Sequence, residues 1–480
     1  MMRSLFSGVS GLKVHQTKMD VIGNNISNVN TIGFKSSSVT FSDVFYQTTQ
    51  NASGPNEATG TAGRNAVQIG LGVNVSSITS SITTAGASQR TDNPFDVMIE
   101  GDGFFVVNYA GANYFTKAGS FGVDSSGSLC TPAGAKVMGW QVDPNDETKT
   151  VANTVSPIKI MSPENLYASP AATTDVYVSG NIDSKDTQLT SDTGRKVNIS
   201  FFDNMGHSYT ADLKVQQSKD ETNQYTVAIT DIKDEDGLSI FLEREVDPDT
   251  GNVTYKASSI NSFSFGGSSF QVSNISEDGK FTIDATQAPV MTFNASTGSF
   301  VSVGDGATPG SSLDLTINAS PSPFQTINVD FSTLTMYSNS GSSNLEATRG
   351  TISGAGAGKK VGNMTGVSID GSGKIFGKYD NGDSKLLGQI VVATFSNPSG
   401  LEAVGNSMYA ATQNSGDFDG IGKDPTQGGG SLTAGVLEMS NVDLSAQFTD
   451  MITTQRGFQA NSRIITTSDT LLEELINLKR

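Results

Sequence analysis

NVDLSAQFTDMITTQRGFQANSRIITTSDTLLEELINLKR, residues 441–480, carries the apolar repeat that decides the fold. Ten of its positions step alternately by four and three residues, and seven are apolar: Leu444, Phe448, Met451, Gln455, Phe458, Ser462, Ile465, Asp469, Leu472 and Ile476. Such spacing over four heptads is typical of a long helix with a coiled-coil seam, about 54 Å long for about 36 residues. We therefore predict a C-terminal helix that needs a helical partner.

The first thirty residues have nearly the same repeat. It runs through Leu5, Val9, Leu12, His15, Met19, Ile22, Ile26 and Val29, so we predict an N-terminal helix that also needs a partner. The polar, glycine-containing run 24–37 should end this helix between Asn28 and Gly33. Spacing alone favours two helices that cover the core of a globular domain. The motifs described below favour assembly between copies instead.

Composition indicates a β-rich protein of several domains. The 480 residues exceed what one core serves, and 52 Gly with only 14 Pro are typical of many strands and turns. Residues 1–80 and 438–480 together are neutral, so the whole net charge of −18 belongs to residues 81–437. This distribution fits ends that are buried in contacts and a middle that faces water, and it disfavours a nucleic-acid partner.

Cysteine content and targeting signals place few constraints on the fold and location of this protein. Cys130 is the only cysteine, so no intramolecular disulfide is possible and stability must come from packing. The N-terminus lacks an apolar region of signal-peptide length, and no apolar run approaches about 18 residues. By these rules alone the protein would be expected in the cytoplasm.

The order of helical and strand-rich segments along the chain predicts discontinuous domains, with one domain inserted into another. The fold class is α+β and mostly β: paired terminal coiled-coil helices, a β-rich middle domain and an inserted all-β outer domain. Short strands and Gly turns begin at Val67, and the same style resumes after residue 366. The predicted parts are the helical domain (1–32 and 438–480), connecting segments (33–75 and 417–437), the middle domain (76–160 and 335–416) and the outer domain (161–334). Within the connectors, residues 47–65 are predicted as a loop or arm and 420–431 as a flexible joint.

No catalytic, cofactor or metal site is predicted. The two histidines are His15, in the first helix, and His207, in a turn that is typical of a surface residue. GAGAGKK (354–360) lacks the spacing of a phosphate loop, and the acidic runs 234–237, 247–251 and 380–383 lack a calcium-loop pattern. We interpret these glycine-rich and acidic runs as turns.

Two separate motifs carry a resemblance to a known family. SGL (10–12) with DVIGNNISNVNTIGFK (20–35), and LEMSNVDLSAQFTDMITTQRGFQANSRIITTSD (437–469), resemble the terminal signatures of the bacterial flagellar rod and hook axial proteins. The middle segments DVMIEGDGFFVV, YFTKAGSF and FFDNMGHSYTADL look like those of the hook branch of this family. The motif residues carried over are Asn24, Asn25, Asn28, Gly33, Phe34, Lys35, Ser440, Asn441, Val442, Asp443, Gln455, Arg456 and Asn461.

The resemblance implies a structural subunit of a curved helical tube, a universal joint that transmits motor torque from rod to filament. The terminal helices would line the tube and the inserted domain would lie outside. The implied polymerisation interface comprises Leu5, Val9, Leu12, Met19, Ile22, Ile26, Val29, Leu444, Phe448, Met451, Phe458, Ile465, Leu472 and Ile476. Implied partners are further copies, the distal rod protein, the hook cap, hook–filament junction proteins and the type III export apparatus. The implied location is extracellular, in the hook and basal body, after export without a cleaved signal.

Alternatives remain at this point. The segment 47–65 has a counterpart in the distal rod, so a distal rod-type axial protein is the second interpretation. A secreted β-rich adhesin would share the composition but would not need heptads at both termini, and an envelope enzyme would need a polar cleft. Similar hook proteins of some spirochaetes carry an intersubunit lysinoalanine link, for which Cys130 is the only candidate here. We favour a structural, partly buried Cys130 over this crosslink.

Overall fold

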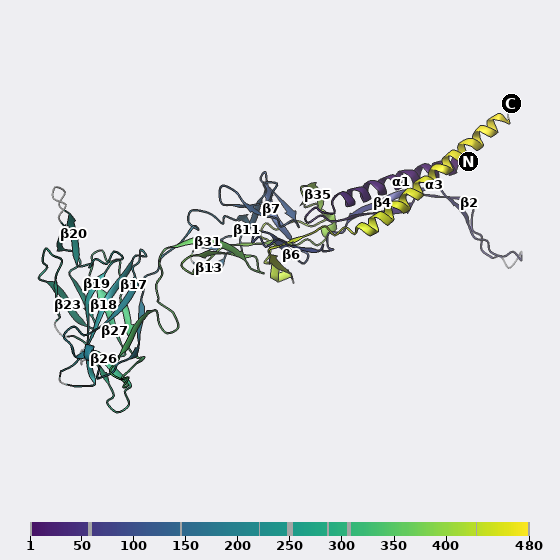
Figure 1. Cartoon of the computed structure of the whole chain (residues 1–480). Coiled ribbons are helices and arrows are strands. Elements are labelled where there is room, and N and C mark those ends of the chain that lie inside the picture. The colour runs from purple at the N-terminus through teal and green to yellow at the C-terminus, as the bar shows by residue number, and fades with distance from the viewer. Residues whose placement is uncertain are drawn as a thin grey trace. The chain divides into compact units, whose positions relative to one another are not determined.

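A computed structural model of the chain describes residues 2–55, 60–144, 146–219, 221–246, 253–285, 288–304, 309–428 and 430–478. Contacts divide it into two compact units (Figure 1). The terminal unit comprises Met1–Leu166, Thr365–Lys378 and Ser384–Arg480, and the inserted unit comprises Tyr167–Met364 and Tyr379–Asp383. Most elements are strands, and the two long helices belong to the chain ends. The predicted fold class is therefore confirmed.

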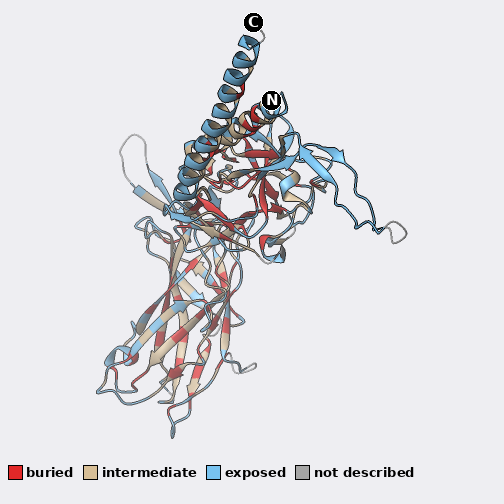
Figure 2. Cartoon of the chain, turned by 90° about the vertical axis from the view of Figure 1, so that its right-hand side faces the viewer, coloured by how far each residue is buried: buried red, intermediate tan, exposed pale blue. Residues whose placement is uncertain are grey.

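The terminal helices are α1 (Met2–Ser27) and α3 (Leu444–Asn477), and they pack along each other (Figure 1). α1 ends at Ser27, just before the predicted stop, and a short series of turns leads to Gly33. α3 begins where the Asp443 carboxylate caps it by accepting hydrogen bonds from the Ser445 and Ala446 backbone N–H groups. α3 also continues past the start of α1, and most of its surface is exposed (Figure 2).

A two-stranded ribbon follows α1. It is built from β1 (Ser37–Asp43) with β4 (Val73–Ser80), and from β2 (Tyr46–Gln50) with β3 (Val67–Gly70). The prediction that strands start at Val67 is therefore wrong, as is the assignment of 47–65 as loop throughout. The Ser- and Thr-rich segments pair with the apolar strands that follow, which the local alternation did not reveal. Residues 56–59 of this segment lie outside the described residues.

The main sheet of the terminal unit has the order β32-β33-β11-β7-β8-β36-β35. Its aromatic core includes Phe104, Phe115 and Tyr409, and Trp140 packs there while its Nε1 donates to the Ile421 carbonyl at 2.8 Å. The strands are β7 (Phe104–Tyr109), β8 (Ala112–Thr116), β11 (Lys136–Trp140), β32 (Lys374–Tyr379), β33 (Ser384–Ile390), β35 (Glu402–Gly405) and β36 (Met408–Ala410).

Further strands lie in this unit, and β31 crosses into it from the inserted unit. They are β5 (Ser88–Arg90), β6 (Val97–Glu100), β9 (Gly122–Val123), β10 (Leu129–Cys130), β12 (Val142–Asp143), β13 (Asp146–Thr150), β14 (Ser156–Pro157), β31 (Gly362–Ile369), β34 (Val392–Ala393), β37 (Ser431–Ala434) and β38 (Val436–Glu438). β37 pairs with β6 and β38 pairs with β5, so the segment that enters α3 is held on strands. Lys423 also forms a two-way backbone bridge with Val392. The prediction of a flexible joint over 420–431 is thus wrong for its described residues.

The inserted unit is a β-sandwich. One sheet has the order β17-β18-β19-β25-β26, the other β24-β23-β22-β27-β28-β16-β29, and β30 pairs with β16. Both contribute to one core, with Phe201 and Tyr225 from the first sheet and Phe263 and Val329 from the second. The elements are β15 (Tyr167–Ala168), β16 (Asp175–Asn181), α2 (Thr187–Thr190), β17 (Arg195–Phe202), β18 (Ser208–Gln217), β19 (Gln224–Lys233), β20 (Leu242–Val246), β21 (Val253–Ala257), β22 (Ser262–Phe265), β23 (Ser268–Ser273), β24 (Thr282–Ala285), β25 (Val290–Phe293), β26 (Phe300–Gly304), β27 (Ser312–Ile317), β28 (Ile327–Asp330), β29 (Leu334–Thr335) and β30 (Asn344–Arg349).

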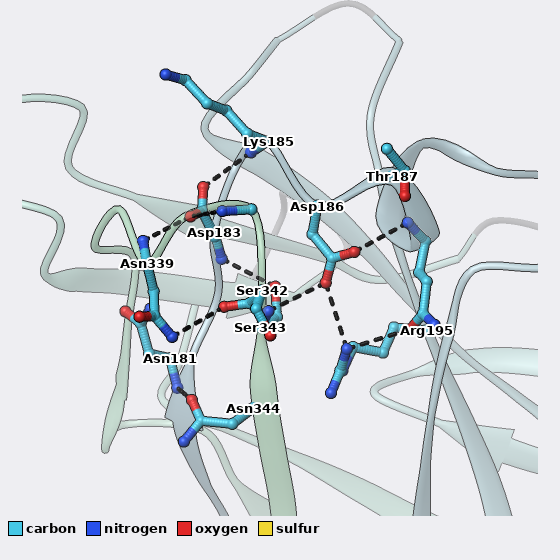
Figure 3. Close-up of polar contacts among 12 residues, drawn as sticks. Asn181, Asp183, Lys185, Asp186, Thr187, Arg195, Asn339, Ser342, Ser343 and Asn344 are labelled. Carbon is cyan, nitrogen blue, oxygen red and sulfur yellow. Dashed lines mark hydrogen bonds and ion pairs between the residues drawn. The ribbon is translucent and has the colours of Figure 1, made fainter.

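Two buried carboxylates fix the end of this unit (Figure 3). Asp183 accepts hydrogen bonds from the backbone N–H groups of Asn339 and Gly341, and Asp186 accepts one from Ser343. Hydrogen bonds from backbone N–H groups, including that of Lys185, lower the pKa of Asp183. Residues 335–364, which we predicted for the middle domain, therefore fold with the inserted unit. The predicted boundary at 334 was misplaced because the hydrogen bonds of Asp183 and Asp186 join residues that are far apart in the chain.

No helix among the described residues has both the length and the hydropathy that a membrane crossing requires.

Candidate functional site

The contact between α1 and α3 is built from small residues. A Cβ at Gly11 would lie 2.7 Å from Asn461 Nδ2, and a Cβ at Gly8 would lie 3.2 Å from Ile465 Cγ1. Real Cβ atoms do not approach other atoms as closely as the first of these distances, so a side chain at Gly11 would require the Asn461 amide to move. The buried residues of α3 are likewise small, Thr454 and Ser468.

His15 occupies the middle of this contact. A Cβ at Gly457 would lie 2.7 Å from its ring, and the ring packs edge-on against Phe41 with centroids 6.0 Å apart. Burial, together with nearby Lys18, lowers the pKa of His15 and so disfavours the charged form of the ring. Lys18 Nζ in turn lies 3.4 Å from Asp450 Oδ1.

The two predicted heptad series are only partly brought together. Ile22 is buried; the half-buried members are Leu5, Leu12, Met19, Ile26, Val29, Met451, Phe458, Ile465 and Leu472. Val9, Leu444, Phe448 and Ile476 are exposed, at 50%, 38%, 51% and 67%. The seam positions Gln455 and Asp469 are also exposed, because the face of α3 toward α1 lies one residue away, at Thr454 and Ser468. The heptads located the helices and part of their inner faces, as at Ile465 beside Gly8.

Several large apolar side chains are exposed on the outer surface of the helices, among polar ones. Besides the exposed seam residues, the large exposed side chains are Met2 and Phe6 on α1, and Ile452, Ile464, Leu471 and Leu475 on α3, followed by Leu478 at its end. The heptad prediction missed all of these. A search for further apolar stripes could have found part of this set, since Ile464, Leu471, Leu475 and Leu478 are separated by seven, four and three residues.

Below the helices, Asn25 links three segments. Its side chain is buried; Nδ2 donates to the Ser37 carbonyl at 2.8 Å and to Gln447 Oε1 at 3.1 Å. Its Oδ1 accepts from the Ser37 backbone N–H at 2.9 Å. The Asn25 amide thus pairs with both the N–H and the carbonyl of Ser37, the first residue of β1. It also holds α3 beside β1 through Gln447. Neither Ser37 nor Gln447 was singled out from the sequence.

A buried ion pair joins the two chain ends. Lys35 Nζ lies 2.6 Å from Glu438 Oε1, and both side chains are about 1% exposed. Lys35 also donates to the Thr84 carbonyl at 2.7 Å, and Glu438 Oε1 accepts from the Gly86 backbone N–H at 2.9 Å. Glu438 Oε2 is buried with no hydrogen-bond partner among the described residues. Sequence reasoning missed Glu438, whose only local signal is a carboxylate between Leu437 and Met439.

Asn441 and Gly33 close the same junction. Asn441 Oδ1 accepts from the Ser36 backbone N–H at 2.7 Å, and its Nδ2 donates to the Ser81 and Thr84 carbonyls. Gly33 has φ +67°, and a Cβ there would lie 2.7 Å from the Ala118 backbone nitrogen. Both the backbone conformation and the space therefore require glycine at this position.

The remaining motif residues make local contacts. Asn28 Nδ2 donates to Asn24 Oδ1 at 3.0 Å, and the Phe34 carbonyl accepts from the Asn441 backbone N–H at 3.4 Å. The Ser440 hydroxyl accepts from the Val442 N–H at 3.4 Å. On α3, Arg456 donates to Gln459 at 3.4 Å and Asn461 Nδ2 to the Gly457 carbonyl at 3.0 Å, while Gln455 is exposed.

A second buried lysine lies beside the ion pair. Lys117 Nζ donates to the Gly101 carbonyl at 2.7 Å and lies 5.1 Å from the centre of the Phe104 ring. Burial lowers the pKa of Lys117 to about 8; Glu438 opposes this change and Lys35 adds to it. The junction thus holds two lysines and one glutamate away from water.

The other candidate features give no sign of chemistry. His207 Nδ1 lies 3.0 Å from buried Asp203 Oδ2 and serves a turn. Residues 352–356 form turns, and Lys359 forms a backbone bridge with Ala171 and pairs with Asp383. No group of three metal-ligating side chains occurs in the described part of the chain, and the acidic run 247–251 falls outside it. Cys130 is half-buried opposite Lys136, and burial with nearby Asp124 raises the pKa of its thiol.

Comparison with known proteins gives matches at both chain ends and in the middle. Three family models match: Flagella basal body rod protein (5–35), Flagellar hook protein FlgE/F/G D1 domain (98–181) and Flagellar basal body rod FlgEFG protein C-terminal (433–478). The flagellar hook protein FlgE of Treponema pallidum is 35% identical over 499 residues, and that of Borreliella burgdorferi 36% over 491, each over 100% of both chains. The flagellar basal-body rod protein FlgG of Bacillus subtilis is 27% identical over 481 residues, also over 100% of both chains.

The buried ion pair generates the first prediction. Lys35→Met leaves the Glu438 carboxylate buried and unpaired, so we expect the free energy of unfolding of the monomer to fall by about 3–5 kcal/mol. Lys35→Met combined with Glu438→Met should recover most of this loss. Denaturant unfolding of the purified variants measures both.

The exposed pair Arg90–Asp92 is the matched control, because its side chains are 82% and 74% exposed. Arg90→Met should leave the free energy of unfolding nearly unchanged. A Lys35→Met variant as stable as Arg90→Met would contradict a structural role for the buried pair.

The second prediction concerns pH. Because the folded pKa of Lys117 lies near 8, below the ordinary value of 10.5, the unfolded chain binds the proton more tightly between these values. The Lys117 contribution to stability is therefore lost below about pH 8 and fully present above about pH 10.5. Its total is on the order of 3 kcal/mol.

Urea unfolding of wild type and Lys117→Met across pH 7–10.5 isolates this contribution. The difference between the two proteins should change with pH in that window, with wild type gaining stability as the pH rises. A constant difference would show that Lys117 is not held in this environment.

Proposed function

The chain belongs to the bacterial flagellar hook protein family, and on that premise we propose that its terminal helices carry the contacts that assemble it. The protein is a structural subunit of the flagellar hook. We assign the polymerisation contacts to the exposed apolar surface of α1 and α3, including Val9, Leu444, Phe448 and Ile476. This exposed surface is the observation that carries the proposal, because an isolated chain leaves it in water at a cost of about 25 cal/mol per Å².

In the proposed polymer the helices form the inner layer of a curved tube. The β-rich sheet of the terminal unit forms the middle layer and the inserted unit the outer layer. This tube acts as a universal joint that transmits torque from rod to filament. The chain needs no catalytic activity for this role, and the family is a structural one rather than an enzyme family.

The proposed partners follow from this position in the flagellum. They are further copies of the chain, the distal rod protein, the hook cap, the hook–filament junction proteins and the type III export apparatus. Export would proceed without a cleaved signal, to an extracellular location in the hook and basal body. The concentration of the net charge of −18 in residues 81–437 suits a surface that faces the medium.

A distal rod-type protein is the second candidate, favoured by the segment 47–65. The identity of 27% to a rod protein against 35% and 36% to hook proteins supports the hook. Electron microscopy of purified hook–basal bodies from cells with a tagged chain tests the choice. Label along the curved hook supports our proposal, and label confined to the straight rod supports the alternative.

The third prediction separates folding from assembly. Phe448 is 51% exposed, so Phe448→Ala should leave the unfolding of the monomer nearly unchanged. In the polymer, each subunit would lose about 1.5–3 kcal/mol of apolar burial, so hooks should become few or absent. Microscopy and swimming assays of cells that produce only this variant measure the effect.

Met205→Ala is the matched control, since Met205 is 57% exposed in the inserted unit. It should leave hook assembly intact. Normal hooks from Phe448→Ala, or equal defects in both variants, would contradict the assignment of the helical surface.

The fourth prediction concerns Cys130. Its raised thiol pKa disfavours the thiolate, and its position on β10 supports a packing role over an intersubunit crosslink. Hooks boiled in detergent and reductant should therefore yield a single monomer band. A ladder of multimers that disappears in Cys130→Ala would instead establish the crosslink.

A further inference from the structure

A pocket of about 400 Å³ opens in the terminal unit at the base of the helix pair. We call it the turn pocket. Four segments form its walls: 31–32 after α1, 116–120 from the end of β8, the turn 131–133, and 406–408 where β35 leads into β36. The pocket borders the ion-pair junction at Ala118, whose backbone contacts Gly33, but neither Lys35 nor Glu438 lines it. The proposed helical surface does not include it either.

The walls of the turn pocket are held in shape by their own hydrogen bonds. Thr116 Oγ1 donates to the Ser407 carbonyl at 2.8 Å and accepts from the Ala118 N–H at 3.0 Å. Thr131 Oγ1 accepts from the Ala135 N–H at 3.2 Å, and the Thr131 N–H donates to the Ala135 carbonyl at 2.8 Å. Both threonine hydroxyls are thus engaged within the walls, and the pocket does not need to form upon binding.

The chemistry of the lining indicates what it accepts. None of the eleven described residues that line it is charged, although 16% of the chain is Asp, Glu, Lys or Arg. Loss of charge at the centre of a surface patch is the compositional mark of a protein–protein contact. A small polar ligand would instead need charged or orienting groups that converge on it.

We propose that the turn pocket receives an apolar side chain from a second copy of this chain. The inference rests on the proposed function, because a chain that assembles with itself supplies such a partner at every pocket. A pocket on one copy that receives a different surface of the next makes a head-to-tail contact, and repetition of that contact builds a helical polymer.

The position of the turn pocket gives this contact a second effect. Ile32 forms one wall, and its carbonyl accepts from Ser407 Oγ at 3.4 Å. Gly33, which follows, packs on the Ala118 backbone. A side chain of a neighbouring copy bound in the turn pocket would therefore stabilise the segment that follows α1. Binding at the β-rich part of the unit and ordering of α1 would then favour each other.

The test fills the pocket. Ala133 is exposed in the turn at its rim, so Ala133→Trp can occupy the pocket without disturbing the core. Ala112→Trp is the matched control, because Ala112 is exposed at the start of β8 and does not line the pocket. In cells that produce each variant as the only hook protein, we expect hooks per cell to fall at least about tenfold for Ala133→Trp, the effect of about 1.4 kcal/mol per contact. Ala112→Trp should assemble as wild type does.

Wild-type levels of hooks from Ala133→Trp, or an equal loss from both variants, would overturn the proposal. Should Ala133→Trp fail to fold by thermal unfolding of the monomer, a photoreactive benzophenone side chain at position 133 replaces it. Irradiated hooks should then yield a crosslinked dimer, and the absence of that dimer would equally overturn the proposal. Failure of the proposed function itself looks different, since the wild-type chain would then form no hooks.

Discussion

The ion pair between Lys35 and Glu438 connects residues that are 403 positions apart, and the arrangement of both chain ends depends on it. Two charges out of water are tolerated only when they are paired and further hydrogen-bonded, and the Thr84 carbonyl and Gly86 N–H supply those bonds. Neither end can take its place alone without leaving a buried charge unpaired. The pair thus couples the end of α1 to the strand that leads into α3, and the antiparallel helix pair follows from that coupling.

The helix pair places small residues at its closest contacts and leaves several large apolar residues exposed, whereas large apolar residues usually face inward. Small residues such as Gly11 and Gly457 face inward, where a Cβ would collide with Asn461 or His15. Many large apolar residues, Phe448 among them, face outward. Val14 and Ile22 are buried, but many of the apolar side chains of the pair stay partly or largely exposed. Because isolated helices of this kind have marginal stability in water, contacts with other copies would add to the order of the helices.

The sequence predicted those features that depend on neighbours along the chain. The heptads at 444–476 and 5–29 located both long helices, because periodicity is a local property. The inward face was predicted only in part, at residues such as Ile22 and Ile465, since the rest depends on close approaches such as that of Gly11 to Asn461 across the fold. Lys35 and Asn441 stood out by family resemblance, but Glu438 did not, because only the folded chain brings it to Lys35. The boundary at residue 334 failed for the same reason: Asp183 binds the 339–341 backbone from a distant segment.

The connections between helices and sheet constrain how a hook of this chain bends. Asn441 ties the segment after α1 to the segment before α3, β38 and β37 pair with β5 and β6, and Lys423 bridges to Val392. The described residues of the predicted flexible joint are therefore held on the sheet by backbone hydrogen bonds. Torque that enters the helices reaches the sheet of the same unit through buried, short-range bonds. Bending that spared these bonds would be accommodated as small sliding movements between packed copies, a motion that packed elements permit without breaking their cores. In the proposed polymer, these bonds would leave the subunit contacts, rather than the helix-to-sheet junction, as the place where the joint bends.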